Sequence, residues 1–182
     1  MSTLGKSLTV LALALGATLI GYLSGQAPRS DAAPAAAPRA FPESAWAQGG
    51  TDLEGRPHSF QEYRGKILLI NFWATWCPPC QKEGPALQRL EEKLQAHGVQ
   101  IVGITIDQAA NLQAYVDKHP SPYPLWLATP QTARLMASLG NPQGGLPFSV
   151  ILDRSGQVRK VLLGAINETE TENLLSSLTQ GQ

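Results

Sequence analysis

The two cysteines of this chain, Cys77 and Cys80, lie two residues apart between an apolar run and a helical pattern. Two thiols at this spacing form and break a disulfide repeatedly, which predicts redox chemistry. Because only a thiolate attacks a disulfide, the unpaired N–H groups of a helix's first turn would stabilise the charge of Cys77. We therefore expect Cys77, at the exposed lip, to attack a partner's disulfide and Cys80, one turn inward, to resolve the mixed disulfide.

Pro78 and Pro79 fill the two positions between the cysteines. Pro79 suits the first helical position because its missing N–H would be unpaired there and its φ is already helical. Both rings stiffen the loop, and we expect them to belong to the surface that binds a substrate. They also remove two backbone donors, which stabilises the Cys77 thiolate less than a donor-rich loop would and favours a reductant.

Two other interpretations of the cysteine pair remain open. A zinc site needs four Cys or His ligands, and His58, His97 and His119 show no ligand spacing. A purely structural disulfide would close so small a loop that it removes little chain entropy. We predict no metal ligand among these residues and no cofactor other than a redox-active disulfide between Cys77 and Cys80.

The residues around the pair resemble a known family. The run from Leu69 to Cys80 (LINFWATWCPPC) is similar to the thioredoxin superfamily and, within it, to the membrane-anchored TlpA/ResA-like thiol-disulfide oxidoreductases. Pro85 matches the proline that kinks the active-site helix of thioredoxins. Gly145-Leu146-Pro147, followed by an apolar stretch, resembles the segment that carries the family's cis-proline beside the active site.

Two positions bear on proton transfer. Asn71 stands where thioredoxins keep a buried aspartate that handles the proton of the resolving cysteine. Glu83, three residues after Cys80, matches a glutamate that TlpA/ResA-like proteins place near the cysteines. We therefore expect Glu83 to be partly buried, to accept or return a proton, and to oppose thiolate formation by its charge. The alternative is that Glu83 is there because glutamate is favoured in a helix's first turn.

The residues and the resemblance give different expectations for the peptide bond before Pro147. From the residues alone a trans bond is favoured, since only about 5–6% of X–Pro bonds in folded proteins are cis. The resemblance implies a cis bond, which would expose the backbone of Leu146 to a partner's extended chain as an added strand. Trp76 and Phe148 would then supply apolar contacts beside the sulfurs, with core or rim packing as the alternative for each.

The N-terminus predicts export. An uncharged segment from Ser7 to Pro28 follows Lys6 and would span about 33 Å as a helix at about 1.5 Å per residue, enough to cross a bilayer. We expect residues 1–27 to be a retained signal anchor in the inner membrane, with cleavage after Gly25-Gln26-Ala27 as the alternative. Residues 28–42, rich in Pro and Ala, are expected to tether a periplasmic or otherwise extracytoplasmic domain to the membrane.

Residues 43–182 suit one redox domain with a sizeable core. Their expected order is a leading hairpin, a strand–helix–strand unit, a central insertion, and a closing hairpin and helix. This order predicts an α/β fold, a three-layer α/β/α sandwich with a mixed central sheet. It is the thioredoxin fold with an N-terminal hairpin and a central insertion, as TlpA/ResA-like proteins have. The expected strands are 67–73, 99–106, 124–127, 148–152 and 158–163, and the later helices are 112–116, 131–139 and 168–178.

The leading hypothesis is an exported thiol-disulfide oxidoreductase that keeps particular protein cysteines reduced in an oxidising compartment. The resemblance implies a membrane-spanning thiol transporter as electron donor, and cytochrome c maturation or copper-centre assembly as settings. Formal net charge is zero, so nothing points to nucleic acid as a partner. A thiol peroxidase is one alternative, although Ala74 stands where peroxiredoxins place Thr or Ser. A copper-binding assembly module using Cys77 and Cys80 is the other.

Overall fold

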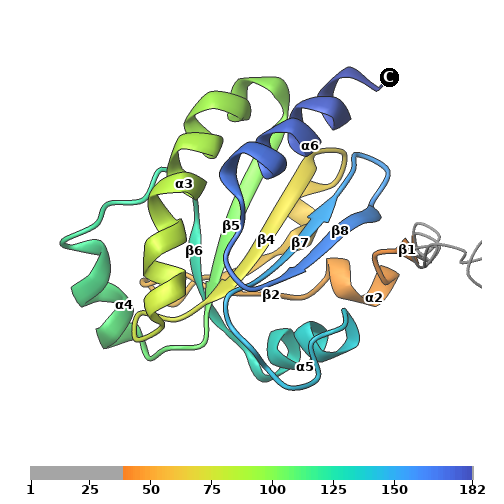
Figure 1. Ribbon diagram of the computed structural model, residues 1–182. Coiled ribbons are helices and arrows are strands. Elements are labelled where there is room, and N and C mark those ends of the chain that lie inside the picture. Colours follow the sequence, from red (N-terminus) through yellow and green to blue (C-terminus); the bar gives the residue numbers. More distant parts are fainter. Residues whose placement is uncertain (1–38, 182) are drawn as a thin grey trace, which may run out of the picture. The chain divides into compact units, whose positions relative to one another are not determined.

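The computed structural model describes residues 39–181, which form a mixed eight-stranded sheet with helices on both faces (Figure 1). The predicted signal segment and residues 28–38 of the predicted tether lie outside the described part. The strand order is β1-β8-β7-β4-β5-β6-β2-β3. The elements in chain order are β1 (Arg39–Ala40), α2 (Glu43–Trp46), β2 (Gly49–Thr51), β3 (Pro57–Ser59), the 3-10 helix η1 (Phe60–Tyr63), β4 (Ile67–Trp73), α3 (Pro78–Leu94), the 3-10 helix η2 (Gln95–His97), β5 (Val99–Thr105), α4 (Ala109–Val116), β6 (Leu125–Ala128), α5 (Pro130–Ser138), β7 (Phe148–Leu152), β8 (Gln157–Leu163) and α6 (Glu168–Gln180).

The centre of the sheet is formed by β4 and β5, which are apolar because both of their faces are covered. β4 runs parallel to β5 and antiparallel to β7. Leu68, Ile70 and Phe72 belong to a core that includes residues of α2 and α5, whereas Ile67 and Leu69 pack with residues of α3 and α6. Figure 1 shows these helix pairs on opposite faces of the sheet. The predicted three-layer thioredoxin fold is confirmed.

Helix α3 carries the cysteine pair and follows β4 after a short loop. Cys77 is its N-cap residue and Pro78 its first helical residue, so the helix begins one residue before Pro79, which the sequence assigns to the first helical position. Leu87, Leu90 and Leu94 are buried on the face that packs against the sheet. Because this apolar face fixes the helix on the sheet, it also fixes the place of the cysteines at the helix start.

The predicted insertion between β5 and β7 is present and consists of α4, β6 and α5. β6 pairs in parallel with β5. β2 and β3 form the predicted N-terminal hairpin, and β2 pairs antiparallel with the outer side of β6. The hairpin and the insertion therefore extend the same side of the sheet.

The folded domain begins earlier than the sequence predicts. Arg39 and Ala40, assigned to the tether, form β1 and pair antiparallel with Val158 and Gln157 of β8. Phe41 is only 3% exposed and packs edge-on against Trp46. Two residues between prolines and alanines carry no strand signal, so the pairing with β8 decides their structure. Among residues 39–181, no helix is both long and apolar enough to cross a bilayer.

Candidate active site

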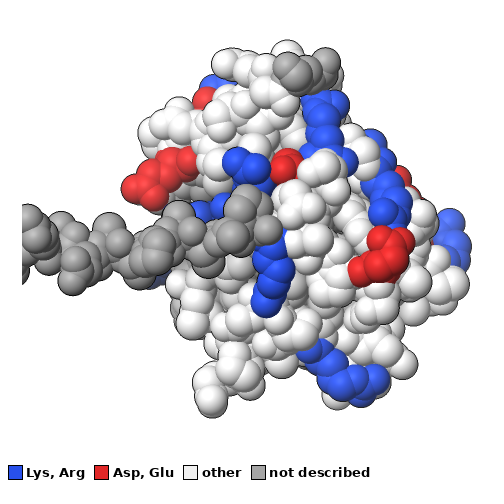
Figure 2. Space-filling view, turned by 90° about the vertical axis from the view of Figure 1, so that its right-hand side faces the viewer, with Lys and Arg blue, Asp and Glu red and all other residues white. Residues whose placement is uncertain are grey.

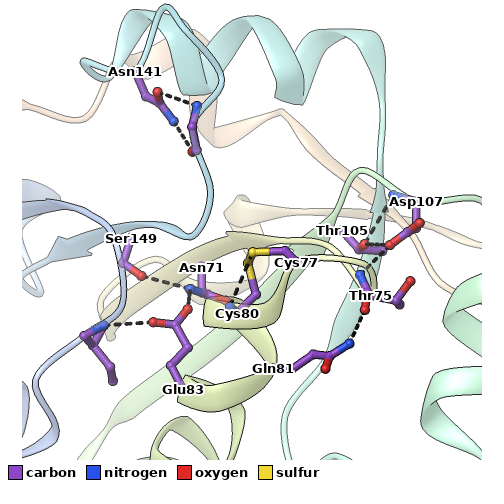
Figure 3. Close-up of a disulfide and its surroundings, with 12 residues drawn as sticks. Asn71, Thr75, Cys77, Cys80, Gln81, Glu83, Thr105, Asp107, Asn141 and Ser149 are labelled. Atoms are coloured by element: carbon purple, nitrogen blue, oxygen red, sulfur yellow. Dashed lines mark hydrogen bonds between the residues drawn. A yellow bond between two sulfur atoms is a disulfide. The ribbon is translucent and has the colours of Figure 1, made fainter.

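Cys77 and Cys80 are joined by a disulfide across the first turn of α3, with their Cα atoms 5.3 Å apart (Figure 3). The Sγ atom of Cys77 also accepts a hydrogen bond from the backbone N–H of Cys80 at 3.3 Å. A sulfur at this position therefore lies within the field of the helix N-terminus, which stabilises a thiolate. The predicted placement of the pair at a helix start is confirmed.

The predicted exposure of Cys77 is wrong for the disulfide form. Cys77 is 4% exposed and Cys80 is 3% exposed, because the bond and the hydrogen bond to Cys80 turn the Cys77 sulfur toward the helix. The surface beside the disulfide is formed instead by its neighbours. Trp76 is 64% exposed, and Pro78 and Pro79 are also exposed. These three residues are among those that the sequence assigns to substrate binding.

Glu83 is buried one turn beyond Cys80 on α3 and is 4% exposed. Its Oε1 atom accepts a hydrogen bond from the side-chain amide of Asn71 at 2.8 Å, and its Oε2 atom accepts one from the backbone N–H of Ile166 at 2.8 Å. The Asn71 amide also donates to the hydroxyl of Ser149 at 3.0 Å. Figure 3 shows Glu83 reaching from α3 toward Asn71, with Ser149 on the other side of the amide.

Burial outweighs the hydrogen bonds of Glu83 in setting the pKa of its carboxyl. Burial raises the pKa of the Glu83 carboxyl above its ordinary value, although the hydrogen bonds from Ile166 and Asn71 lower it in part. A carboxyl with a raised pKa is better matched to proton transfer near neutral pH than an ordinary glutamate. The acid that thioredoxins place on the central strand is here on α3 and is hydrogen-bonded to the Asn71 side chain of that strand.

The loop before β7 brings a second predicted segment to the cysteines. The peptide bond between Leu146 and Pro147 is cis, as the resemblance implies. Leu146 packs against the cluster that contains both cysteines, and Pro147 is buried. Phe148 does not reach the sulfurs: it is 1% exposed and packs against Phe72 in the core on the other face of the sheet. Its strand position turns it away from α3, so the core-packing alternative holds.

Asn141 holds this loop, and its role was missed from the sequence. Asn141 is 2% exposed; its amide donates to the carbonyl of Gly145 at 2.7 Å and its side-chain oxygen accepts from the N–H of Gly145 at 3.0 Å. Figure 3 shows both hydrogen bonds. Since Gly145 precedes Leu146, this clamp fixes the chain next to a residue that packs against the cysteine cluster.

Asp107 holds the loop that precedes Cys77. Its Oδ2 atom accepts a hydrogen bond from the backbone N–H of Thr75 at 2.6 Å, and its Oδ1 atom accepts one from Asn111 at 3.3 Å. The Gln81 side chain donates to the carbonyl of Thr75. One signal for Asp107 was present in the sequence: parallel strands end at the same edge of a sheet, so a residue following β5 lies beside those following β4.

Residues 38–161 match the AhpC/TSA family. The chain belongs to this family of the thioredoxin superfamily. Among curated family relatives, the thiol-disulfide oxidoreductase ResA of Geobacillus thermodenitrificans is 30% identical over 129 residues, 70% of this chain and 72% of the relative. The thiol:disulfide interchange protein of Chlorobium tepidum aligns with a TM-score of 0.68 at 29% identity, covering 78% of this chain and 97% of its own. A thioredoxin-related protein of Neisseria meningitidis aligns with a TM-score of 0.64 at 28% identity, covering 72% and 99%.

These similarities and the disulfide together establish the reaction class. This chain aligns with the oxidoreductase ResA, and its two cysteines form a disulfide at the start of α3. As a member of this family, the chain is a thiol-disulfide oxidoreductase with the thioredoxin fold.

Proposed function

We propose that this chain is an exported reductase of protein disulfides that acts through a mixed disulfide on Cys77. The observation that carries the proposal is the Cys77–Cys80 disulfide at the N-terminus of α3, with Leu146 packed against the cluster that contains both cysteines. Within residues 39–181, neither the N–H nor the carbonyl of Leu146 has a hydrogen-bond partner. An extended substrate segment would pair with these two groups and bring its disulfide to Cys77.

Exposed apolar side chains support a protein substrate. Trp76 and Leu163 are 64% and 67% exposed. The Leu163 side chain lies over Gly145, since a Cβ built on that glycine would be 3.0 Å from its methyl carbon. One exposed apolar side chain therefore precedes Cys77 and another lies over the glycine before Leu146, which fits the apolar residues of a polypeptide substrate. Trp76, Pro78, Pro79, Leu146 and Pro147 would form this contact surface.

The reaction would proceed in two exchanges. The Cys77 thiolate, stabilised by the helix N-terminus, attacks one sulfur of the substrate and releases the other. Cys80 then attacks Cys77, which releases the reduced substrate and forms the intramolecular disulfide. Glu83 accepts or returns the proton of the resolving exchange. No bound cofactor takes part, because the two electrons come from the cysteine pair.

The proposal also includes the cellular setting. We propose that the segment before residue 39 anchors the domain at the outer face of the inner membrane. A membrane-spanning thiol transporter would then return the disulfide to its dithiol form. Protein disulfides in the extracytoplasmic space, and not nucleic acids, are the proposed partners.

The experiment that tests the direction of the reaction is an equilibrium redox titration of the full chain against glutathione or dithiothreitol, followed by tryptophan fluorescence. We expect a reduction potential of about −250 mV or lower, close to that of thioredoxin, which identifies a reductant. A value near about −120 mV would make the protein a disulfide donor and contradict the proposal. A pair that does not titrate reversibly would instead favour a structural or metal-binding role.

Asn141→Ala is expected to weaken substrate binding through the loop that carries Leu146. The change leaves the N–H and the carbonyl of Gly145 without partners, which costs about 1–3 kcal/mol of folding free energy. We expect KM for a protein disulfide to rise while kcat changes little, because the cysteines stay in place. Asn173→Ala, at an exposed position of α6, is the control and should change neither quantity. An unchanged KM would show that the clamp serves stability alone.

A further inference from the structure

A surface groove of about 620 Å³ separates α3 from α4, the first helix of the insertion. Gln81 and Pro85 line it from α3, and Ala114 and Lys118 line it from α4 and the turn after it. The groove begins beside Thr75, in the loop that leads to Cys77. The insertion therefore adds a solvent-filled space next to the active-site helix.

Behind this groove lies an inner cavity of about 20 Å³, lined by Cys80 and Asn71 among others. This volume holds one water molecule, which needs roughly 10–15 Å³. Polar residues line it, among them Asn71 and Tyr115, and a buried water needs polar partners of this kind. The inner cavity and the groove share four lining residues: Gly84, Gln88, Tyr115 and His119. The wall between Cys80 and solvent is therefore only one layer of residues thick.

Tyr115 stands at this boundary. Its ring lies 4.9 Å from that of Trp73 and 4.8 Å from that of His119, between centroids, so neighbours on both sides hold it in place. Its hydroxyl faces the backbone of α3, because a Cβ built on Gly84 would be 3.6 Å from that oxygen. Burial raises the pKa of Tyr115, so the hydroxyl stays protonated and can both accept and donate a hydrogen bond.

The resolving exchange needs a path for a proton. Cys80 must lose its thiol proton to attack, yet it is only 3% exposed. Glu83 is 4% exposed, and both of its oxygens already accept hydrogen bonds from the protein. A proton that leaves Cys80, or that Glu83 takes up, must therefore cross protein to reach bulk water.

We propose that one water molecule in the inner cavity, positioned by the Tyr115 hydroxyl, carries the proton of Cys80 to the solvent of the α3–α4 groove. This inference rests on the proposed function and supplies the proton path of its resolving step. Asn71 lines the same cavity and donates a hydrogen bond to Glu83, so the carboxyl with which the water would exchange protons lies directly behind the cavity wall. The other titratable groups that face the passage are His119 and Tyr123, with Lys118 in the groove.

Atoms and electrons balance in this step. The S–H bond of Cys80 breaks and its proton passes to the water, while a proton leaves from the Tyr115 hydroxyl to the groove and is replaced from the water. The Cys80 thiolate forms a bond to the Sγ of Cys77, and the bond between Cys77 and the substrate sulfur breaks. The substrate sulfur leaves with the electron pair and is protonated by solvent. Two electrons pass from the cysteine pair to the substrate disulfide.

The test uses Tyr115→Phe in the reduced full chain, mixed with one equivalent of the aromatic disulfide dithiobis(nitrobenzoate). This probe releases one coloured thiolate when the first cysteine attacks and a second when the other cysteine resolves the mixed disulfide. The phenylalanine keeps the ring packing and removes only the hydroxyl. Tyr63→Phe is the matched control, a half-buried tyrosine on η1 whose ring packs against Trp126, outside the passage.

We expect Tyr115→Phe to slow the second release about tenfold, less than the 10²–10⁴ that general acid–base catalysis supplies as a whole. The first release and the reduction potential should stay at their wild-type values, because a proton path changes a rate and not an equilibrium. A second release at the wild-type rate, or one slowed together with a shifted potential, would overturn the proposal. Reduction of the probe without reduction of any protein disulfide would contradict the proposed function and leave the proton path standing.

Discussion

Cys80→Ser is expected to accumulate a covalent complex with its substrate through Cys77, whereas Cys77→Ser is expected to form none. The physical reason is the placement of the two sulfurs. In the disulfide form both are nearly buried, at 4% and 3% exposure, so exposure does not separate them. Cys77 caps α3 and its sulfur accepts the N–H of Cys80, whereas Cys80 is the third residue of the helix. The sulfur at the cap position therefore has the N–H donor that stabilises a thiolate.

Both variants should lose turnover by roughly a thousandfold or more, as is usual when one member of a catalytic unit is removed. The measurement is non-reducing electrophoresis of each variant incubated with an oxidised protein, followed by peptide mapping of the crosslink. Loss of the disulfide itself costs only about 2 kcal/mol for so short a loop, so both variants should remain folded. A crosslink that maps to Cys80 in the Cys77→Ser variant, and none in Cys80→Ser, would reverse the assignment of the two roles.

The start of α3 and the central strand β4 could be predicted because each follows from a short stretch of sequence. The helix start at Cys77 follows from a proline after the cap and an apolar period behind it. Strand β4 follows from a run that is apolar except for Asn71, as expected for a strand covered on both faces. The cis bond before Pro147 could be expected only through the family resemblance, because the residues alone favour trans.

The positioning contacts are harder to predict, because two of them join distant segments and the third depends on the shape of a loop. Glu83 bonds to Ile166, which is 83 residues later in the chain, and Thr75 bonds to Asp107 across the ends of two strands. Asn141 looks like an ordinary loop residue, since its partner Gly145 is defined only by the shape of the loop. The exposure of Cys77 was misjudged because position at a helix start does not determine which way a sulfur turns.

Glu83→Gln is expected to slow the resolving exchange about a hundredfold at neutral pH. Two effects oppose each other. Loss of the buried base removes proton transfer that supplies about 10²–10⁴ in rate. Loss of the negative charge lowers the pKa of the neighbouring thiol, and a thiol pKa lower by about one gives about ten times more thiolate. The first effect is larger, so the rate should fall while the thiol pKa falls with it. An unchanged thiol pKa would remove Glu83 from the mechanism.

Glu91→Gln supplies a matched control on the same helix. Glu91 is 2% exposed, burial raises the pKa of its carboxyl, and it also accepts one backbone N–H, from Ile101 at 2.7 Å, and one side-chain amide, from Gln100 at 2.9 Å. In either variant the new amide group meets one of these donors, which costs about 1–3 kcal/mol. The two variants should therefore lose similar stability, and only Glu83→Gln should change the rate of exchange.

The pH dependence of the free energy of unfolding gives a second comparison of Glu83→Gln with Glu91→Gln. The folded pKa of each carboxyl lies above its unfolded value, so between those two values the native state binds more protons than the unfolded state. The free energy of unfolding must then fall as pH rises through that window, and each Gln variant should remove one part of the slope. Urea unfolding at a series of pH values measures it. We expect the two variants to lose equal parts of the slope of unfolding free energy against pH, whereas only Glu83→Gln slows the thiol-disulfide exchange. That result would separate the effect of burial on a glutamate from the role of Glu83 in the exchange.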